Sequence, residues 1–486
     1  MHRAYLVALV MALAGCALGP NFKRPAAPTA IDYGSSAKAV GATARPETVS
    51  DAQRYIAGMD VPDQWWRVFG SQEINGLVAR ALAGNPNIKA AQAALRQAHE
   101  LYLAQRTSFF PNVQGSFAAD RSEFPVNTLT SPTVASSSTY TLYTAQLSLS
   151  YAPDIFGATR RQVEIAQAQA ESARFQLEAS YVTLSTNVVV AAIQEASLRG
   201  QIATTERLLQ MEHQLTGLAQ QQRRLGTASD LDVLSQLALE AQTAQMLPPL
   251  QKQLGQTRDA LIALLGKLPS DDLPENVQLN QLTLPADLPL SVPSKLVEQR
   301  PDVRQAEENL HAATAAVGVA ITDLLPQFAI TADVGSSALT LGKLFTPYTG
   351  FWDAGASLTQ TLLDAGALIH KKHAADAALD QAAALYRAAV ILACQNVADT
   401  LRAIEADADA QKASGEALRA AEKTFDLAQK QRALGTINLV ALLNAEQSYG
   451  TAALSDIQAR ANRYADTAAL FQALGGGWWN RTQETR

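Results

Sequence analysis

The stretch YTAQLSLSY, residues 143–151, alternates apolar and polar side chains over its whole length. Because successive side chains of a β-strand point to opposite faces, this alternation predicts a strand with one apolar and one polar face. Tyrosines stand at both ends of the stretch, as aromatic residues do at the two surfaces of a membrane. The pattern predicts either a membrane-spanning strand or part of a soluble hairpin packed on helices, and alternation alone favours neither.

Three further stretches alternate in the same way, so that strands are predicted at about 112–120, 140–151, 327–335 and 351–360. Each has about the length that a strand needs to span a bilayer. Four strands cannot close a barrel, and hydrocarbon does not tolerate open strand edges, so several copies of the chain must share one barrel. Two copies would enclose a filled interior, whereas three would supply twelve strands around a passage. Polar inner faces need water, which favours a trimer.

The chain contains two copies of one pattern. Pro86 and Pro301 lie 215 residues apart, and so do Pro111 and Pro326. Further along, the turns Leu225-Gly226-Thr227 and Leu434-Gly435-Thr436 repeat with a spacing of 209 residues. Each copy predicts a helical stretch, two strands, a very long helix, a tight turn and a returning helix.

Long stretches without proline predict very long helices. We expect helices over residues 157–224, 228–266, 366–433 and 437–474. The first would be about 100 Å long, whereas helices of globular proteins average about 10–14 residues. A seven-residue apolar repeat predicts coiled-coil packing, although a plain helical bundle would explain it equally well. The repeat is formed in the second copy by Ala383, Val390, Val397 and Ile404.

The N-terminus predicts a secretory signal over residues 1–15, with Arg3 followed by a short apolar stretch. Residues 13–16, Leu-Ala-Gly-Cys, resemble the bacterial lipobox, in which the cysteine is acylated and becomes the first mature residue. An ordinary signal peptide with a chance cysteine is the alternative. A covalent lipid on Cys16 would anchor the chain in a membrane. Ala17 stands where inner-membrane retention signals place Asp, so the resemblance implies the outer membrane.

Composition excludes several classes of function. The formal charge of −6 gives no basic surface for nucleic acid. No run of 18 apolar residues follows the N-terminus, so we expect no transmembrane helix. With Cys16 lipidated, the second cysteine, Cys394, has no partner for a disulfide within the chain and is expected to be a packing residue.

No enzyme motif is visible in the sequence. A phosphate-binding loop, a Gly-x-Ser-x-Gly elbow and a His-Glu-x-x-His motif are all absent. His370, His373 and Asp376 share a helical face, but the adjacent lysines indicate a solvated surface rather than a metal site. We therefore expect no enzymatic activity, no metal and no cofactor besides the lipid on Cys16.

Three segments together resemble the TolC-type outer membrane efflux protein family, and within it the lipoprotein branch similar to OprM and NodT. They are residues 16–25, the paired Leu-Gly-Thr turns, and residues 473–478, Ala-Leu-Gly-Gly-Gly-Trp. The resemblance covers nearly the whole chain. It implies a mixed α and β fold with two structural repeats, in which a homotrimer builds a twelve-stranded barrel on an α-helical barrel.

The resemblance also implies a division of the chain into segments. These are a signal peptide (1–15), a lipidated segment and belt (16–70), repeat 1 (71–266), a Pro-rich belt segment (267–293), repeat 2 (294–474) and a C-terminal tail (475–486) that would join the belt. Within the tail, the glycines Gly475–Gly477 are expected to be flexible.

Family members are passive exit ducts of tripartite efflux pumps. The resemblance therefore implies two partners, a periplasmic adaptor protein and an inner-membrane transporter of the RND type. The adaptor would contact the helix tips, although these residues could instead only close the helical hairpins. The candidate tip residues are Arg223, Arg224, Leu225, Gly226, Thr227, Ala433, Leu434, Gly435 and Thr436.

The expected periplasmic gate departs from the family pattern. Relatives commonly carry aspartates just after the second tip, where this chain has the neutral residues Ala441 and Asn444. We expect closure by Val440 and Asn444, with weak sensitivity to pH and divalent cations; conductance that rises steeply on acidification would contradict this. Asp230 and Asp232 could supply the charge instead, although Asp230 is also a candidate helix N-cap.

Two alternatives to the efflux duct remain open at this stage. The chain could be the exit duct of a type I protein secretion system, or a lipid-anchored coiled-coil spacer without a pore.

Overall fold

The computed structural model describes residues 17–28, 47–50, 53–124, 138–271 and 276–481. The expected signal peptide and Cys16 lie outside these residues. The chain forms two compact units. Unit 1 comprises residues 1–24, 95–173 and 306–386, and unit 2 comprises residues 25–94, 174–305 and 387–486. Two helices of 67 residues each, α4 (Ala158–Arg224) and α9 (Ala367–Ala433), contribute to both units.

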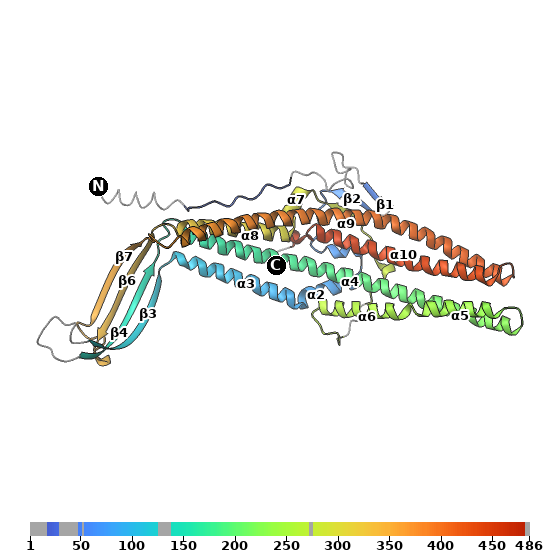
Figure 1. Ribbon diagram of the computed structural model, residues 1–486, viewed down its shortest axis with the longest axis horizontal. Coiled ribbons are helices and arrows are strands. Elements are labelled where there is room, and N and C mark those ends of the chain that lie inside the picture. Colours follow the sequence, from blue (N-terminus) through green and yellow to red (C-terminus); the bar gives the residue numbers. More distant parts are fainter. Residues whose placement is uncertain (1–16, 29–46, 51–52, 125–137, 272–275, 482–486) are drawn as a thin grey trace. The chain divides into compact units, whose positions relative to one another are not determined.

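Unit 1 contains a four-stranded antiparallel sheet in the order β3-β4-β6-β7 (Figure 1). The four strands lie where the sequence predicts them, and three run two to four residues further toward the connecting loops. Their bounds are Asn112–Phe124 for β3, Ser138–Tyr151 for β4, Gln327–Ala338 for β6 and Gly350–Thr359 for β7. β3 and β7 are the two edges of this sheet, and neither has a further partner among the described residues.

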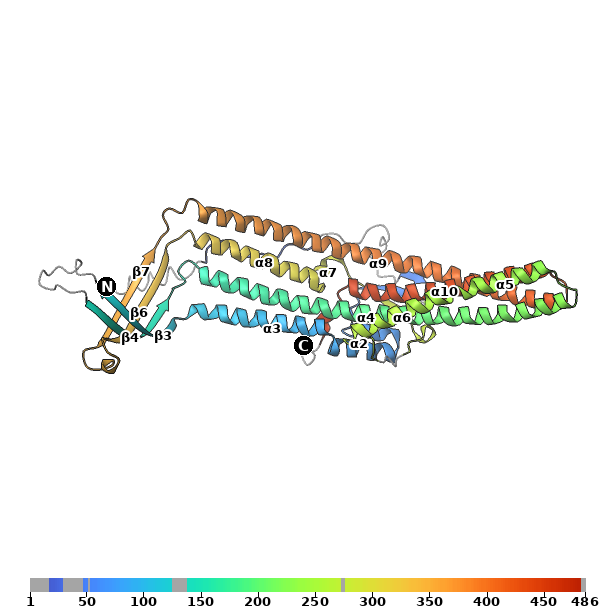
Figure 2. The same ribbon diagram turned by 60° about the horizontal axis from the view of Figure 1, so that its bottom comes forward.

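Unit 2 is built mainly from two helical hairpins (Figures 1 and 2). α4 returns through α5 (Asp230–Ala244), and α9 returns through α10 (Leu439–Ala473). Side chains join each pair: His213 on α4 bonds Glu240 on α5, and Phe425 on α9 stacks on Tyr449 of α10. The hairpins predicted from the two Leu-Gly-Thr turns are therefore present.

The single helix expected over residues 228–266 is wrong. The structure has α5 and then a separate helix α6 (Leu247–Leu264), with Pro248 and Pro249 in the first turn of α6. Proline lacks the backbone N–H and clashes with the preceding turn, so it is accommodated at a helix start rather than within a helix.

The helical stretches ahead of the strands are interrupted in both copies. The first copy has α2 (Gln72–Gly84) and α3 (Pro86–Arg106), and the second has α7 (Pro293–Gln299) and α8 (Pro301–Thr322). Asn85 and Arg300 separate the helices, and both have extended backbones. Each precedes a proline, which disfavours the helical conformation of the residue before it.

A second sheet, in unit 2, was not predicted. Its order is β1-β2-β5, with β2 (Gln53–Ala57) antiparallel to β1 (Glu47–Ser50) and parallel to β5 (Asp287–Leu290). These strands of four or five residues are too short to show an alternating pattern.

Short 3-10 helices complete the described elements: η2 (Trp65–Phe69), η3 (Thr107–Phe109), η5 (Leu279–Gln281), η6 (Leu341–Lys343) and η7 (Trp478–Asn480).

The C-terminal glycines form a buried turn, so the expectation of a flexible tail is wrong for Gly475–Gly477. All three glycines have positive φ, and a Cβ added to Gly477 would lie 2.3 Å from the carbonyl oxygen of Pro62. The following Trp478 donates from Nε1 to the carbonyl of Gln299 at 2.7 Å. Glycine is therefore required here by close backbone packing.

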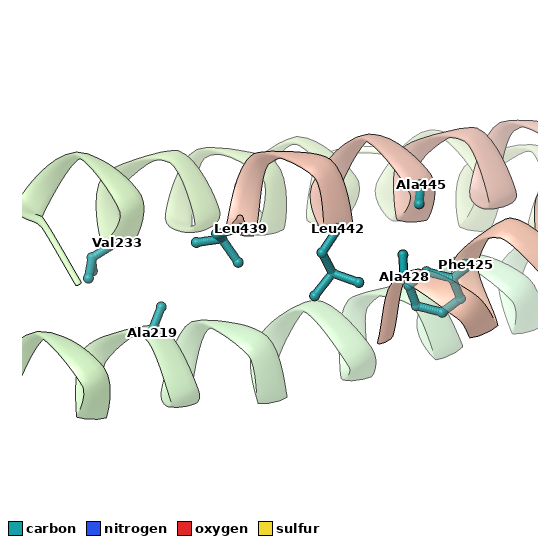
Figure 3. Close-up of a cluster of buried hydrophobic side chains, with 7 residues drawn as sticks. All are labelled: Ala219, Val233, Phe425, Ala428, Leu439, Leu442 and Ala445. Carbon is teal, nitrogen blue, oxygen red and sulfur yellow. The ribbon is translucent and has the colours of Figure 1, made fainter. Parts of the chain in front are cut away.

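An apolar core joins the two hairpins near their turns (Figure 3). Ala219 of α4 and Ala428 of α9 lie 209 residues apart in the sequence, as do Val233 of α5 and Leu442 of α10. Equivalent positions of the two copies thus contribute to the same core. The remaining side chains of this core are Phe425, Leu439 and Ala445.

Candidate functional site

The β3-β4-β6-β7 sheet has one strongly apolar face. In the strand register, Leu147 lies opposite Gly115 and Val334, and Val334 lies opposite Trp352. The large exposed apolar side chains of the strands all lie on this face among the described residues: Val113, Phe117, Leu147, Ile330, Val334, Trp352 and Leu358. Apart from Arg121 and Glu123 at the loop end of β3, this face has no charged side chain among the described strand residues, and it is suited to contact lipid rather than water.

The opposite face of the same sheet is polar. Ser148 lies opposite Gln114 and Asp333, and Asp333 lies opposite Asp353. Among the described strand residues, the charged side chains on this face are Asp120, Asp333 and Asp353, with no basic residue beside them. The Asp333–Asp353 pairing was not foreseen, because it depends on the register of two strands rather than on a motif. A face of this composition can line an aqueous passage with negative potential.

The segment that follows Cys16 forms a strap, residues 17–24, along unit 1. The N–H of Leu18 donates to the carbonyl of Phe156 at 3.1 Å, and Arg161 donates from Nη2 to Oδ1 of Asn21 at 2.7 Å. Phe22 stacks on His311 with ring centroids 4.4 Å apart, and Arg24 pairs with Glu307 on α8 at 2.9 Å.

Two close backbone approaches hold the start of this strap. A Cβ added to Gly157 would lie 2.5 Å from Cα of Ala17, and one added to Gly19 would lie 2.5 Å from Cα of Gly318. Ala17 is therefore fixed against the residue that precedes α4, six residues after the end of β4. This places the described residue next to Cys16 beside the sheet that carries the apolar face.

The two Leu-Gly-Thr turns have the same geometry. Gly226 has a φ of 72° and Gly435 a φ of 73°, so each glycine permits the reversal that the sequence predicts. The N–H groups of Thr227 and Thr436 both donate at 2.9 Å to a carbonyl of the preceding helix, and both hydroxyls donate to the same carbonyl at 3.0 Å.

The apolar side chains at these turns are exposed. Leu225 is 72% exposed and Leu434 is 79% exposed, while Arg223 forms an ion pair with Asp230 across the first turn. Arg224 ends α4, and Ala433 ends α9. Paired exposed leucines with nearby charges can contact another protein. Whether an adaptor binds them stays a prediction.

Sequence reasoning missed Arg432, which joins the two turns. Its guanidinium donates from Nη2 to Oε1 of Gln222 at 3.0 Å and from Nη1 to the carbonyl of Ile437 at 3.3 Å. In the sequence, only the position of Arg432 just before the second turn could have indicated this contact.

The gate candidates on α10 share the exposed face of that helix. Val440, Ala441 and Asn444 are exposed, whereas Leu439, Leu442 and Ala445 point into the core shown in Figure 3. Asn438 caps α10 by accepting from the N–H of Ala441 at 2.9 Å. The three candidates are free to line an aperture, and their role as the gate stays a prediction.

The gate candidates on α5 are engaged in local contacts. Asp230 is not the N-cap, because Ser229 caps α5 and Asp232 closes a capping box with it. The N–H and hydroxyl of Ser229 hold the pKa of Asp232 below its usual range. Both aspartates are thus occupied at the start of α5, which favours Val440 and Asn444 as the gate.

The histidine cluster on α9 has no metal-binding arrangement. The His370 and His373 rings are 6.2 Å apart, and Asp376 pairs with Lys372 at 2.7 Å. In the part of the chain that the structure describes, no group of three His, Cys, Asp or Glu side chains could hold a metal ion.

The helix α9 differs from one expectation. Within the described residues, it is long and apolar enough to cross a membrane, and 11% of its apolar window is buried in the chain. The sequence-based prediction required an unbroken run of apolar residues. An 18-residue part of α9 instead reaches a mean hydropathy of 1.3 because it is rich in alanine, although it also contains charged residues. An exposed apolar helix face of this kind needs cover from lipid or from another chain.

Comparison with known proteins decides the family. A family model described as "Outer membrane efflux protein" matches residues 77–267 and 292–476. The chain belongs to this family. The toluene efflux pump outer membrane protein TtgF of Pseudomonas putida is 29% identical over 486 residues, which cover 99% of this chain and 98% of that protein.

Two further relatives of the outer membrane efflux family extend this finding. The pyoverdine export outer membrane protein OpmQ of Pseudomonas putida is 28% identical over 423 residues, covering 86% of this chain and 89% of that protein. The solved structure of the outer-membrane channel OprN superposes with a TM-score of 0.85 at 27% identity, covering 95% of this chain and 100% of that chain. The expected TolC-like fold is confirmed.

Proposed function

We propose that the chain is the outer-membrane exit duct of a tripartite efflux pump, in which it passively conducts small molecules out of the periplasm. The observation that carries this proposal is the four-stranded sheet with one apolar face, one polar face and two edges that no described strand pairs with. Within a membrane such edges must pair with other strands, so copies of the chain would complete a closed wall. Three copies would supply twelve strands around an aqueous passage.

The exposed apolar surface of α9 supports the same assembly. In a trimer, neighbouring copies would cover this helix face and form a helical barrel outside the membrane. Migration of the unheated protein as a trimer, together with conductance in a planar lipid bilayer, tests the duct. A monomer without conductance would favour a lipid-anchored spacer instead.

A lipid on Cys16 is the second part of the proposal. The strap fixes Ala17 next to the apolar sheet, where an acyl chain on the preceding residue could enter the membrane. Mass spectrometry of the N-terminal peptide should find an acylated Cys16, and Cys16→Ala should abolish the modification. A mature chain that begins elsewhere would contradict lipidation.

The partners complete the proposal. The exposed Leu225 and Leu434 would contact a periplasmic adaptor, which would couple the duct to an inner-membrane transporter of the RND type. Photo-crosslinking in cells from Thr227 and Thr436, followed by mass spectrometry, tests this contact. Capture of an adaptor of a proton-driven efflux transporter would support it, and capture of a secretion-system adaptor would favour type I secretion.

The relatives differ in what their names say they export, toluene in one and pyoverdine in the other. We expect the inner-membrane partner, rather than the duct, to select the exported molecule.

A further inference from the structure

A polar cluster interrupts the apolar contact between the two hairpins of unit 2. Glu446 follows Ala445 of the core on α10, and only 1% of its surface is exposed. Glu212 on α4 is 3% exposed, and Gln236 on α5 is fully buried. Two carboxyl groups and an amide from three helices are thus enclosed between the hairpins.

Four of the five side-chain oxygen atoms of this cluster lack a hydrogen-bond donor among the described residues. Both carboxyl oxygens of Glu446, Oε2 of Glu212 and Oε1 of Gln236 have no partner among the described residues. Oε1 of Glu212 accepts from the Thr243 hydroxyl at 2.8 Å, while the Gln236 amide donates elsewhere, to the carbonyl of Glu212 at 3.4 Å. A buried carboxylate without donors is costly, whereas a protonated carboxyl supplies a donor of its own.

The surroundings of Glu446 favour its neutral form. Burial, reinforced by the charge of Glu212, raises the pKa of Glu446 to about 7. Burial also raises the pKa of Glu212, and Glu240 on α5 reinforces this, against the hydrogen bond from Thr243.

Other titratable groups lie on the packed elements, and Asp407 on α9 also has its pKa raised to about 7, by burial and by Asp466 on α10. Glu240 accepts from Thr216 and pairs with His213, which holds its pKa below the usual range, so it stays ionised. Further along α10, Tyr449 shares a cavity of about 250 Å³ with Glu422 of α9 and Arg207 of α4.

We propose that Glu446 and Glu212 form a proton-binding site that holds the α9–α10 hairpin against the α4–α5 hairpin. A proton on Glu446 keeps this buried carboxyl neutral beside Glu212 and so keeps the hairpins packed. Loss of that proton leaves two buried negative charges that repel each other, and the hairpins separate so that water can reach them.

The packed and the separated hairpins bind the proton of Glu446 with different affinity, which makes the packing depend on pH. Packed hairpins hold the proton of Glu446 up to about pH 7, whereas a water-exposed glutamate releases it near its ordinary value of 4.5. The packed state therefore binds more protons between these values, and it loses stability as the pH rises from 4.5 toward 7. Periplasmic pH would thus set how firmly the hairpins are held together.

The consequence for transport rests on the proposed function. Val440 and Asn444 lie on α10 within two turns of Glu446, so a shift of α10 would move both gate candidates. The aperture residues alone predict weak pH sensitivity, and the buried pair adds opening as the pH rises. Conductance that increases on acidification would contradict both expectations.

The test combines infrared spectroscopy with amide hydrogen exchange on the purified full-length protein between pH 5 and 8.5. Because Asp407 on α9 also has its pKa raised to about 7, the band of Glu446 is isolated as the difference between the spectra of the wild type and Glu446→Gln. In that difference, the carbonyl band of the protonated Glu446 carboxyl should be present at pH 5.5 and half lost near pH 7. Glu212→Gln should move the midpoint of the Glu446 band to lower pH, because the repelling neighbour is gone. Glu206→Gln on the exposed face of α4 removes one charge elsewhere and should leave the titration unchanged.

Amide hydrogen exchange measures how firmly the two hairpins are packed together. After correction for intrinsic rates, amides of residues 439–450 should exchange several-fold faster at pH 8 than at pH 5.5 in the wild type, but not in Glu446→Gln. Absence of the difference band between wild type and Glu446→Gln at pH 5.5, or titration of that band without altered exchange, would overturn the proposal. So would loss of the band at pH 5.5 on addition of Ca²⁺ alone, which would identify a cation site.

Conductance in planar bilayers is measured separately. Wild-type conductance should rise between pH 5.5 and 8, and that of Glu446→Gln should not. If no variant conducts, the proposed duct fails, whereas the spectroscopic and exchange results still decide the proton site.

Discussion

At the residue scale, glycine has two distinct uses in this protein. At Gly226 and Gly435 an added Cβ would meet nothing within 4 Å, so glycine is needed only for the positive φ of the turn. At Gly19, Gly318 and Gly477 an added Cβ would collide with backbone or with Arg161. The two uses predict different effects of the same substitution to alanine.

Gly226→Ala should destabilise the first hairpin turn by about 1 kcal/mol, because an L-residue is strained at positive φ. Gly217→Ala is the matched control, since Gly217 lies in the exposed interior of α4 with open space around it. That control should stabilise the protein by up to about 1 kcal/mol. Thermal unfolding checks both; shifts of the same sign would contradict the argument.

Gly318→Ala should loosen the strap, because its Cβ would come within 3.0 Å of the Leu18 carbonyl and of Arg161. Faster amide exchange over residues 18–24 is the expected result. Gly255→Ala, at an exposed site on α6 with nothing nearby, should leave this exchange unchanged. Equal exchange in the two variants would show that the close approach is not what holds the strap.

At the element scale, each returning helix begins with its own cap. Ser229 and Asp232 form a capping box on α5, and Asn438 accepts from Ala441 on α10. These caps satisfy backbone N–H groups that the helix itself leaves free. The turn and the cap together let each long helix reverse within a few residues.

Ser229→Ala should cost about 1 kcal/mol, because it removes the oxygen that accepts from the N–H of Asp232. Local exchange of the first turn of α5 is the readout. Ser180→Ala is the control, since the Ser180 hydroxyl bonds a carbonyl within α4 and caps nothing. A first turn of α5 that exchanges equally in both variants would exclude the capping role.

At the scale of the whole molecule, the polar sheet face carries only negative charge. Asp333 and Asp353 lie directly opposite each other, where like charges are destabilising. Three copies around a passage would bring six of these carboxylates to one level. A water-filled passage with this potential would concentrate cations.

The double variant Asp333→Asn and Asp353→Asn should lower the preference of the pore for K⁺ over Cl⁻. Reversal potentials in a KCl gradient measure this preference directly. Asp259→Asn on α6 removes a charge outside the sheet and should have no effect. Unchanged selectivity in the double variant would place these aspartates away from the ion path.

A gate formed by Val440, Ala441 and Asn444, as we propose, would respond weakly to divalent cations, and introduced acidic residues should make it respond strongly. Wild-type conductance should change little with millimolar Ca²⁺, because Val440, Ala441 and Asn444 carry no charge. Ala441→Asp with Asn444→Asp should make conductance fall on addition of Ca²⁺, which the introduced carboxylates would bind. Strong inhibition of the wild type by Ca²⁺ would instead implicate Asp230 and Asp232.

Local patterns in the sequence determined the repeat, the four strands, the two turns and the long helices. Each depends on neighbouring residues, such as the alternation of residues 143–151 or the glycine of a Leu-Gly-Thr turn. The strand pairing of β2 with β5, the buried turn at Gly475–Gly477 and the break at Pro248 were missed or wrongly predicted. The break at Pro248 could have been predicted from the sequence, because a proline interrupts a helix through its own missing N–H group and its clash with the preceding turn.

Only the tertiary structure decided which residues from distant parts of the chain meet. Asp333 faces Asp353 because of strand register, and Glu212 approaches Glu446 because two hairpins pack together. Alternation specifies the faces of a strand but not its partner, and a helical repeat specifies an apolar face but not what covers it. Burial and charge pairing arise from those long-range contacts, so the candidate proton site could not be predicted from the sequence.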